Sequence, residues 1–175
     1  MAERIGLVIV HTGNGKGKTT AALGLALRAI GQGFRVVMLQ FIKSGRNYGE
    51  LNAARHLPGL EIVPMGRGFV KTNPHPRAED LEMARTTFET AQEKIRSGAY
   101  DMVILDEINY AVQFGLLDVQ DVLELIRSKP PEVHLVLTGR NARPEVIEVA
   151  DLVTEMREIK HPYQKGIKAQ KGIEY

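Results

Sequence analysis

One stretch near the amino terminus constrains the fold more than any other part of the chain. An apolar run over residues 5–10 leads into a glycine-rich turn, a Lys-Thr pair and a helix-like segment over residues 20–30. Strand, glycine-rich turn, Lys-Thr and helix, in that order, is the layout of a phosphate-binding P-loop. The stretch therefore predicts an α/β protein that binds a nucleotide or a phosphate group.

Each part of this stretch has a physical role in anion binding. Gly13, Gly15 and Gly17 permit the positive φ that lets backbone N–H groups converge on one anion. The helix adds unpaired N–H groups and the positive end of its dipole. Lys18 brings a full positive charge, and Thr19 brings a hydroxyl suited to a Mg²⁺ ion that bridges phosphate oxygens.

Length, charge and cysteine content exclude several other classes of protein. The 175 residues suit one domain with its own core, and a net charge of +2 is too small to indicate a nucleic acid or an anionic membrane as partner. Without cysteine there is no disulfide, no Cys-ligated zinc and no Cys-held iron–sulfur cluster. No apolar stretch approaches the ~20 residues of a membrane span, and the first strand leaves no room for a signal peptide. We therefore expect a cytoplasmic protein.

Hydrophobic periodicity predicts the other elements. The predicted strands cover residues 35–41, 60–65, 100–107, 133–137 and 152–156, and the predicted helices cover residues 49–56, 81–95, 119–126 and 144–150. The intervening segments are a long loop at 66–76, a short connection at 109–117 and an aperiodic tail from about 158 to 175. The pattern predicts a single P-loop NTPase-like (RecA-like) domain over residues 1–175, a doubly wound α/β sheet of about six mostly parallel strands.

Charged residues lie at or just beyond the ends of two predicted strands. Asp106 and Glu107 close one of them, where an acid beside a P-loop holds Mg²⁺ directly or through water; a helix cap or salt bridge is the alternative. Arg140 follows another, where a guanidinium reaches phosphate oxygens; a surface arginine is the alternative. Arg28 lies on the helix after the P-loop, and the same two roles stay open for it.

Several stretches together resemble one family, the CobA/BtuR-type ATP:corrinoid adenosyltransferases, which act on cob(I)alamin or cob(I)yrinic acid a,c-diamide. The resemblance runs nearly from end to end and includes the tail, which generic P-loop proteins lack. The stretches are residues 12–22, Gln-Phe-Ile-Lys (40–43), Gly-Phe (68–69), Leu-Asp-Glu (105–107), Leu-Thr-Gly-Arg (137–140), Lys-His-Pro-Tyr (160–163) and the closing residues 166–175.

The resemblance implies a reaction. Reduced Co(I) of a corrinoid attacks the 5′ carbon of ATP, which gives an adenosylcobalamin-type product and inorganic triphosphate, and ATP lies reversed relative to most P-loop proteins. Because the whole triphosphate leaves, the protein needs a deep anion cradle, with Lys18 as its catalytic charge, rather than a base for water. By motif position the nucleotide ligands are Gly13, Asn14, Gly15, Lys16, Gly17, Lys18, Thr19 and Thr20, with Arg28 and Arg140 as helpers, and the Mg²⁺ ligands are Thr19 and Glu107, with Asp106.

The resemblance also gives Phe69 a role with the corrinoid. In the family, apolar side chains displace the lower axial ligand, and the four-coordinate cobalt takes an electron more readily; the alternative for Phe69 is a loop side chain packed in the core. Family members often have Gly-Phe-Thr-Trp where this chain has Gly-Phe-Val-Lys (68–71) and no tryptophan at all. Lys71 cannot supply the aromatic ring of the tryptophan that it replaces. This difference from the family pattern concerns how the corrinoid is bound and which corrinoid is preferred. A second departure is Thr12, which replaces the first glycine of the usual P-loop pattern.

The nucleophile belongs to the corrinoid, so no catalytic Ser, Cys or His is required. The lack of cysteine agrees with an external reductant, such as a flavodoxin-like protein or reduced flavin, and the resemblance implies a homodimer. Two alternatives remain open. Another P-loop phosphotransferase or ATPase would release ADP rather than triphosphate, and a non-catalytic module would bind nucleotide and corrinoid without turnover.

Overall fold

The structure, a computed structural model, describes residues 4–45, 48–68 and 76–174. Six strands form one sheet in the order β3-β2-β4-β5-β1-β6, and every strand pair is parallel. The strands are β1 (Val8–Thr12), β2 (Val36–Gln40), β3 (Leu60–Pro64), β4 (Met102–Asp106), β5 (His134–Thr138) and β6 (Leu152–Glu155). The helices are α1 (Lys18–Gly31), α2 (Gly49–Ala54), α3 (Ala78–Arg96), α4 (Ile108–Gln113), α5 (Val119–Ser128), α6 (Pro144–Val149) and a 3₁₀ turn, Pro162–Lys165. The predicted doubly wound α/β sheet is confirmed.

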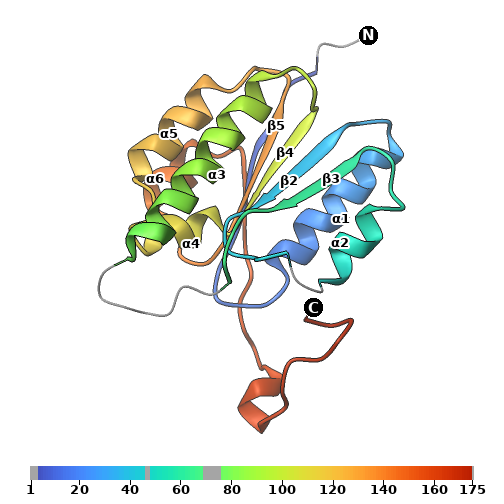
Figure 1. Cartoon of the computed structure of the whole chain (residues 1–175), viewed down its shortest axis with the longest axis vertical. Helices are drawn as coiled ribbons and strands as arrows, with labels where there is room; N and C mark the ends of the chain where they lie inside the picture. Colours follow the sequence, from blue (N-terminus) through green and yellow to red (C-terminus); the bar gives the residue numbers. More distant parts are fainter. Residues whose placement is uncertain (1–3, 46–47, 69–75, 175) are drawn as a thin grey trace.

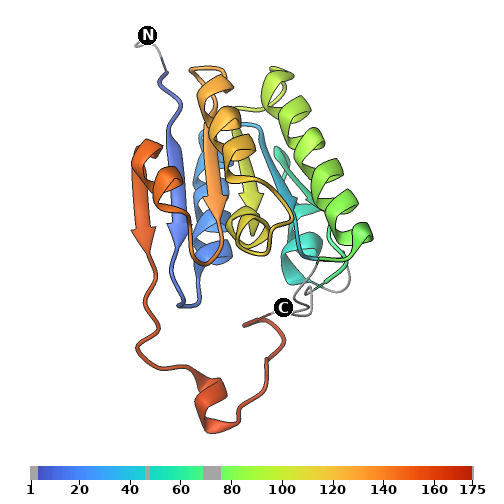
Figure 2. The same ribbon diagram turned by 90° about the vertical axis from the view of Figure 1, so that its left-hand side faces the viewer.

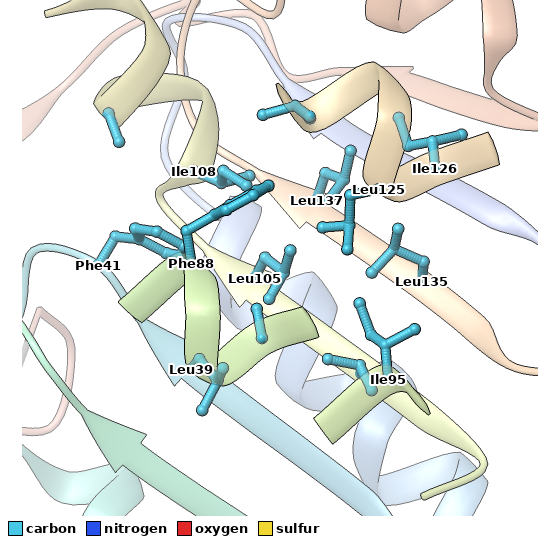
Figure 3. Close-up of a cluster of buried hydrophobic side chains, with 14 of the residues drawn as sticks. Leu39, Phe41, Phe88, Ile95, Leu105, Ile108, Leu125, Ile126, Leu135 and Leu137 are labelled. Atoms are coloured by element: carbon cyan, nitrogen blue, oxygen red, sulfur yellow. The ribbon is translucent and has the colours of Figure 1, made fainter. Parts of the chain in front are cut away.

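Helices cover both faces of the sheet, with α1 and α2 on one face and α3 to α6 on the other (Figures 1 and 2). The smaller core lies on the α1 face and includes Met38 and Ile104. The larger core lies on the opposite face and includes Ile95, Leu105 and Leu125 (Figure 3). Because both faces are covered, β2, β4 and β5 are almost continuously apolar, which is why their positions could be predicted from the sequence.

The parallel arrangement decides where a site can form. All strands end at one edge of the sheet, here called the carboxyl edge, and begin at the other, the amino edge. Ligands of open parallel sheets bind at the carboxyl edge, because the loops that follow the strands meet there. Strand β5 separates β1, which carries the P-loop, from β4, which ends in Asp106.

Three differences from the sequence prediction bear on the carboxyl edge. The first strand is Val8–Thr12 rather than residues 5–10, because its pairing with β5 and β6 includes the buried His11 and Thr12. Residues 108–113 form helix α4 where only a connection was expected; six residues are too short to show helical periodicity. Glu107 lies beyond the end of β4 rather than within it.

The tail leaves β6, extends beyond the carboxyl edge of the sheet and then turns back toward it, as Figure 2 shows. Apart from its 3₁₀ turn it has no regular structure among the described residues, in line with its aperiodic sequence. None of the helices that the structure describes is long and apolar enough to cross a membrane.

Candidate active site

The P-loop connects the carboxyl end of β1 to the first turn of α1. Gly17 is the N-cap of α1, with φ 114°, and no side chain caps this helix end. The first N–H groups of an α-helix have no partner within the helix, so those of α1 are available to an anion. The helix begins at Lys18, two residues earlier than its sequence indicated, and this places Lys18 and Thr19 in the first turn.

The three loop glycines are required for two different reasons. Gly13 (φ 95°) and Gly17 (φ 114°) have the expected positive φ, which favours glycine. Gly15 does not; a Cβ there would lie 2.8 Å from the backbone of Arg157, in the segment after β6. The positive-φ prediction was therefore wrong for Gly15, whose place is fixed by close packing of the tail. Its N–H also donates to the Met156 carbonyl at 2.7 Å.

The segment after β6 holds the P-loop through further contacts. The Met156 N–H donates to the carbonyl of Thr12, and the Glu158 N–H donates to the Asn14 side chain at 3.2 Å. Near the end of the chain, Glu174 lies 3.9 Å from the Lys16 ammonium. The tail is thus a structural neighbour of the loop, although nearly 150 residues of sequence separate the two.

Thr12 has a role that glycine could not fill. Its hydroxyl accepts the N–H of Ala142, in the loop after β5, at 3.0 Å. The side chain therefore connects the P-loop to the neighbouring loop at the carboxyl edge. This accounts for a threonine at the first P-loop position.

Lys18 is buried and is held by the loop itself. Its ammonium donates to the carbonyls of Gly13 at 2.8 Å and Gly15 at 2.7 Å. Burial lowers the pKa of Lys18, and the nearby Arg140 charge lowers it too, whereas the carboxylates of Glu107 and Asp106 act in the opposite direction. The cation is therefore fixed beside the helix terminus at an energetic cost that an anionic ligand would offset.

Asp106 is fully buried and its two carboxylate oxygens face different groups. Oδ1 accepts the hydroxyls of Thr19 at 2.8 Å and Thr138 at 2.9 Å. Oδ2 accepts the Gln40 amide at 3.3 Å. Since the Thr19 hydroxyl donates its proton to Asp106, its oxygen lone pairs are left for a cation. Asp106 can thus act on a metal through Thr19.

Glu107 has an unusual backbone conformation beside this network. It is the N-cap of α4 with φ 64°, a left-handed conformation that is uncommon for a residue other than glycine, and its N–H donates to the Thr138 hydroxyl at 2.9 Å. Burial and the neighbouring Asp106 raise the pKa of Glu107, while Lys18, Lys43 and Arg140 oppose that rise. Such strained residues persist where the surrounding structure holds them, most often at functional sites.

These oxygens fit a Mg²⁺ ion. Mg²⁺ prefers hard oxygen ligands and is usually held by one or two protein oxygens together with substrate phosphates and water. Thr19 supplies a hydroxyl with free lone pairs and Glu107 supplies a carboxylate that lies close enough to Lys18 for their charges to interact. The donor set is therefore of the right chemistry for the metal that the sequence predicts.

The structure separates the two candidate arginines. Arg140 follows β5 at the carboxyl edge, and its charge acts on both Lys18 and Glu107. Arg28 lies exposed in the last turn of α1, about 15 Å further along the helix from Lys18 at ~1.5 Å per residue. This position argues against a role for Arg28 near phosphates bound by the P-loop, because α1 runs back toward the amino edge.

Several residues of this network were missed at the sequence level. Thr138 and Gln40 contact Asp106 directly, and Lys43 lies 4.0 Å from it while pairing with Glu50 at 2.5 Å. The sequence does contain a sign of Gln40. A polar side chain at the end of an apolar strand is expected to be buried and to need a hydrogen-bond partner, and Gln40 is indeed fully buried. Partial burial opposes ionisation of Glu50, but the hydrogen bond and charge of Lys43, together with a backbone hydrogen bond and one from Gln40, outweigh it and lower the pKa of Glu50.

The corrinoid side of the predicted site is only partly described. Phe69, Val70 and Lys71 lie outside the described residues. The described part of that loop packs closely on the segment after β2: the N–H groups of Gly66 and Gly68 donate to the carbonyls of Lys43 at 2.9 Å and Ile42 at 2.7 Å.

Comparison with known proteins decides the family. A family model described as ATP:corrinoid adenosyltransferase BtuR/CobO/CobP matches residues 4–175. The chain belongs to this family. The assignment confirms the resemblance drawn from the sequence, and with it an enzyme that transfers the adenosyl group of ATP to a corrinoid.

Individual relatives agree with the assignment to the corrinoid adenosyltransferases. A protein of Sinorhizobium sp named corrinoid adenosyltransferase is 44% identical over 173 residues, which cover 97% of this chain and 80% of the relative. An Escherichia coli (strain K12) protein of the same name is 39% identical over 170 residues, covering 97% and 86%. The Salmonella typhimurium corrinoid adenosyltransferase CobA is 37% identical over 173 residues, covering 99% and 87%.

A solved structure extends the comparison to the fold. The flagellar accessory protein FlaH from Methanocaldococcus jannaschii superposes with a TM-score of 0.60 over 87% of this chain and 71% of its own, at 14% sequence identity. At that identity the likeness concerns the fold alone. It shows that the α/β architecture of this adenosyltransferase family member is shared with a distant protein.

Proposed function

We propose that the protein transfers the 5′-deoxyadenosyl group of ATP to the Co(I) centre of a reduced corrinoid and releases triphosphate. In this displacement the cobalt lone pair forms the Co–C bond to C5′, and the C5′–O bond breaks with its electrons leaving on triphosphate. The observation that carries the proposal is the family match over residues 4–175, which includes both the P-loop and the tail packed on it.

The chain's part in this reaction is to hold the leaving group. We place the triphosphate on the N–H groups of residues 13–20 and beside Lys18. A helix terminus contributes only ~0.3–1 kcal/mol, rising to ~2 kcal/mol when partly buried. A preorganised donor aimed at developing charge contributes about 3–4 kcal/mol. The helix end alone is too weak, so Lys18 and the loop N–H groups act together. The proposal includes the reversed placement of ATP that the resemblance implies, because C5′ must face the corrinoid.

The metal site is part of the proposal. Thr19 and Glu107 would hold Mg²⁺, and Asp106 would act through the Thr19 hydroxyl, to which it is hydrogen bonded at 2.8 Å. When bound, the ion neutralises charge on the triphosphate and so favours its departure. Arg140, whose charge reaches Lys18 and Glu107, would contact the same anion from the loop after β5.

On the corrinoid side the proposal rests on the sequence resemblance. Phe69 would displace the lower axial ligand of Co(II) before reduction. In that case Phe69→Ala impairs the reaction started from Co(II) and leaves the reaction from pre-reduced Co(I) largely intact. Equal loss from both starting states contradicts this role. Substituting Thr-Trp for Val70-Lys71 and comparing several corrinoids tests whether these two residues set corrinoid preference.

The proposal also covers the setting of the reaction. An external donor, a flavodoxin-like protein or reduced flavin, would reduce Co(II), since the chain has no cysteine to relay electrons. We expect a homodimer, which light scattering tests, and a cytoplasmic location, because ATP is an intracellular substrate.

An anaerobic assay tests the function directly. Purified protein is mixed with Mg-ATP and chemically reduced cobalamin, and both the absorbance spectrum and the phosphate product are followed. Light-sensitive adenosylcobalamin together with triphosphate is the expected result. ADP as product would indicate the alternative phosphotransferase or ATPase. ATP binding without any Co–C bond would indicate a non-catalytic binding module.

A further inference from the structure

Lys43 occupies a position beside the predicted metal site that no catalytic role yet explains. It follows β2 at the carboxyl edge, and its ammonium lies 4.0 Å from Asp106 Oδ2. Gln40, three residues earlier, donates to the same oxygen. The other oxygen, Oδ1, faces Thr19 and Thr138. Gln40 of β2 and Lys43 of the segment after it thus lie at one oxygen of the carboxylate, while the other oxygen is directed at the P-loop helix.

Lys43 is itself held in place. Its ammonium donates to Glu50 Oε1 at 2.5 Å and lies 4.9 Å from the centroid of the Tyr48 ring. Its carbonyl accepts the Gly66 N–H at 2.9 Å. The side chain is only 20% exposed, so the pair with Glu50 is less screened than a surface ion pair. Both the backbone and the side chain of Lys43 are therefore fixed before any ligand binds.

Asp106 needs such a neighbour because it is completely buried. A buried carboxylate is stable in its ionised form only when donors or cations compensate the lost hydration. Among the described residues, Lys43 is the one ion-pair partner of Asp106. A cation and an amide on Oδ2 leave the carboxylate one orientation, in which Oδ1 meets the Thr19 hydroxyl.

We propose that Lys43 is a positioning residue: together with Gln40 it fixes the Asp106 carboxylate so that Oδ1 holds the Thr19 hydroxyl in the orientation that metal–ATP binding requires. The inference rests on the proposed function, which places Mg²⁺ on Thr19. Lys43 touches neither ATP nor the metal in this account. Its effect passes through Asp106 to Thr19.

The test measures metal-dependent ATP binding rather than turnover. ATP affinity is determined by calorimetry at a series of Mg²⁺ concentrations, without corrinoid. We expect Lys43→Met to raise the Mg²⁺ concentration for half-maximal tight ATP binding by about 10-fold, the lower end of the ~10–100-fold loss seen when groups that orient metal ligands are removed. Lys43→Arg keeps a cation beside Asp106 and is expected to shift the Mg²⁺ dependence less than Lys43→Met does.

Two further variants separate positioning from general stability. Lys43→Met leaves Glu50 facing Asp106 without a cation, so the double variant Lys43→Met/Glu50→Gln removes that repulsion and is expected to stay defective in metal-dependent binding. Lys94→Met is the matched control, because Lys94 donates to Glu61 at 3.1 Å and to the Tyr100 hydroxyl at 2.9 Å at the opposite edge of the sheet. It is expected to lower Tm and leave the Mg²⁺ dependence unchanged.

Each outcome decides the matter. A Lys43→Met protein with wild-type Mg²⁺ dependence overturns the inference while the proposed function stands. Full restoration in the double variant also overturns it, since Lys43 would then only neutralise Glu50. If Lys94→Met raises the Mg²⁺ concentration for half-maximal ATP binding as much as Lys43→Met does, the effect comes from lower stability and the inference is overturned. ATP affinity that is independent of Mg²⁺ in the wild type overturns the metal part of the proposed function, and this inference with it.

Discussion

The two edges of the sheet use charge in different ways. At the amino edge, Asp101 contacts the Arg4 guanidinium at 2.9 Å and the Arg35 guanidinium at 3.2 Å. Lys94, Glu61 and Tyr100 form a second cluster there. In both clusters a carboxylate meets a cation directly, near solvent. These contacts join strands to neighbouring helices and loops, and each cation in them is paired directly with a carboxylate.

At the carboxyl edge two charged side chains, Lys18 and Asp106, are buried and are compensated mainly by neutral hydrogen-bonding groups. Lys18 donates to backbone carbonyls rather than to a carboxylate, and Asp106 accepts two hydroxyls. The unpaired N–H groups of α1 lie beside them. Buried charges and unpaired N–H groups lower the stability of the fold until a bound ligand replaces their lost hydration. The ion pairs at the amino edge already compensate each other's charge. Both edges carry charged residues. The functional edge differs in that its buried charges are held by neutral hydrogen-bonding groups, whereas the charges at the amino edge are held in direct ion pairs.

The largest effect is expected for Lys18→Ala. Removing a preorganised cation from the triphosphate site should lower kcat/KM by at least about 10²–10³-fold, the loss seen when one such donor is removed. Lys129→Met is the matched control, because Lys129 is a part-buried lysine that donates to the Gly6 carbonyl at 2.8 Å at the amino edge. Anaerobic turnover with Co(I) and Mg-ATP measures both. Wild-type turnover in Lys18→Ala contradicts the P-loop assignment.

A smaller but still large effect is expected for Gly13→Ala. The left-handed backbone costs ~1–2 kcal/mol with a Cβ, and that Cβ would lie 2.4 Å from the Met156 carbonyl oxygen, so the loop or the tail must move. ATP affinity should fall by at least about 10-fold, equivalent to 1.4 kcal/mol. Gly98→Ala, at the amino edge, also has positive φ but meets no atom within 4 Å. It should lose stability only. Equal ATP affinities for the two variants would show that the tail does not shape the loop.

Asp101→Asn tests the amino edge. We expect a loss of about 1–2 kcal/mol of unfolding free energy at pH 7, because hydrogen bonds to charged groups are lost, and unchanged turnover. Burial opposes ionisation, but hydrogen bonds from Arg35 and Arg4 outweigh it and lower the pKa of Asp101. The folded state therefore binds its proton less readily, so the stabilisation is present above the unfolded pKa of about 3.9 and is lost as pH falls below it. Denaturant unfolding at pH 7 and pH 3 measures this, and a pH-independent difference would contradict it.

The smallest effect concerns His11, at the end of β1. Its side chain is buried, and among the described residues neither ring nitrogen has a hydrogen-bond partner. Burial lowers the pKa of His11, so the unfolded chain binds the proton more readily and stability falls as pH drops below about 6.5. His11→Phe removes this dependence. Between pH 7 and pH 5 the Tm of wild type should fall by about 2–4 °C relative to the variant, which corresponds to about 1 kcal/mol. Parallel Tm curves would contradict the prediction.

The sequence was most informative where chemistry is local in the chain. The P-loop, Lys18 and Thr19 lie within a few residues, and the apolar strands around them are continuous, so their type and order could be predicted. The family could be recognised from the same stretches together with the tail. Boundaries were less accurate where polar residues are buried, as in β1, or where a helix is as short as α4.

Other parts of the site depend on which strands are neighbours. The Asp106 carboxylate is surrounded by Gln40 of β2, Thr138 of β5 and Thr19 of α1. Hydrophobic periodicity gives each strand but not the order β3-β2-β4-β5-β1-β6, so this convergence was not predictable. The direction of α1 similarly places Arg28 far along the helix from Lys18, while the loop after β5 places the Arg140 charge near Glu107; neither position could be read from the sequence.

The sequence by itself determined that this chain has a nucleotide cradle, a carboxylate pair at a strand end and the pattern of a corrinoid adenosyltransferase. Only the tertiary structure decided that the tail packs on Gly15, that Glu107 is held in a left-handed conformation, and that Lys43 lies beside Asp106. The physical reason is that a buried charge must be compensated by whatever groups the fold brings within contact distance, and those groups come from segments far apart in the chain.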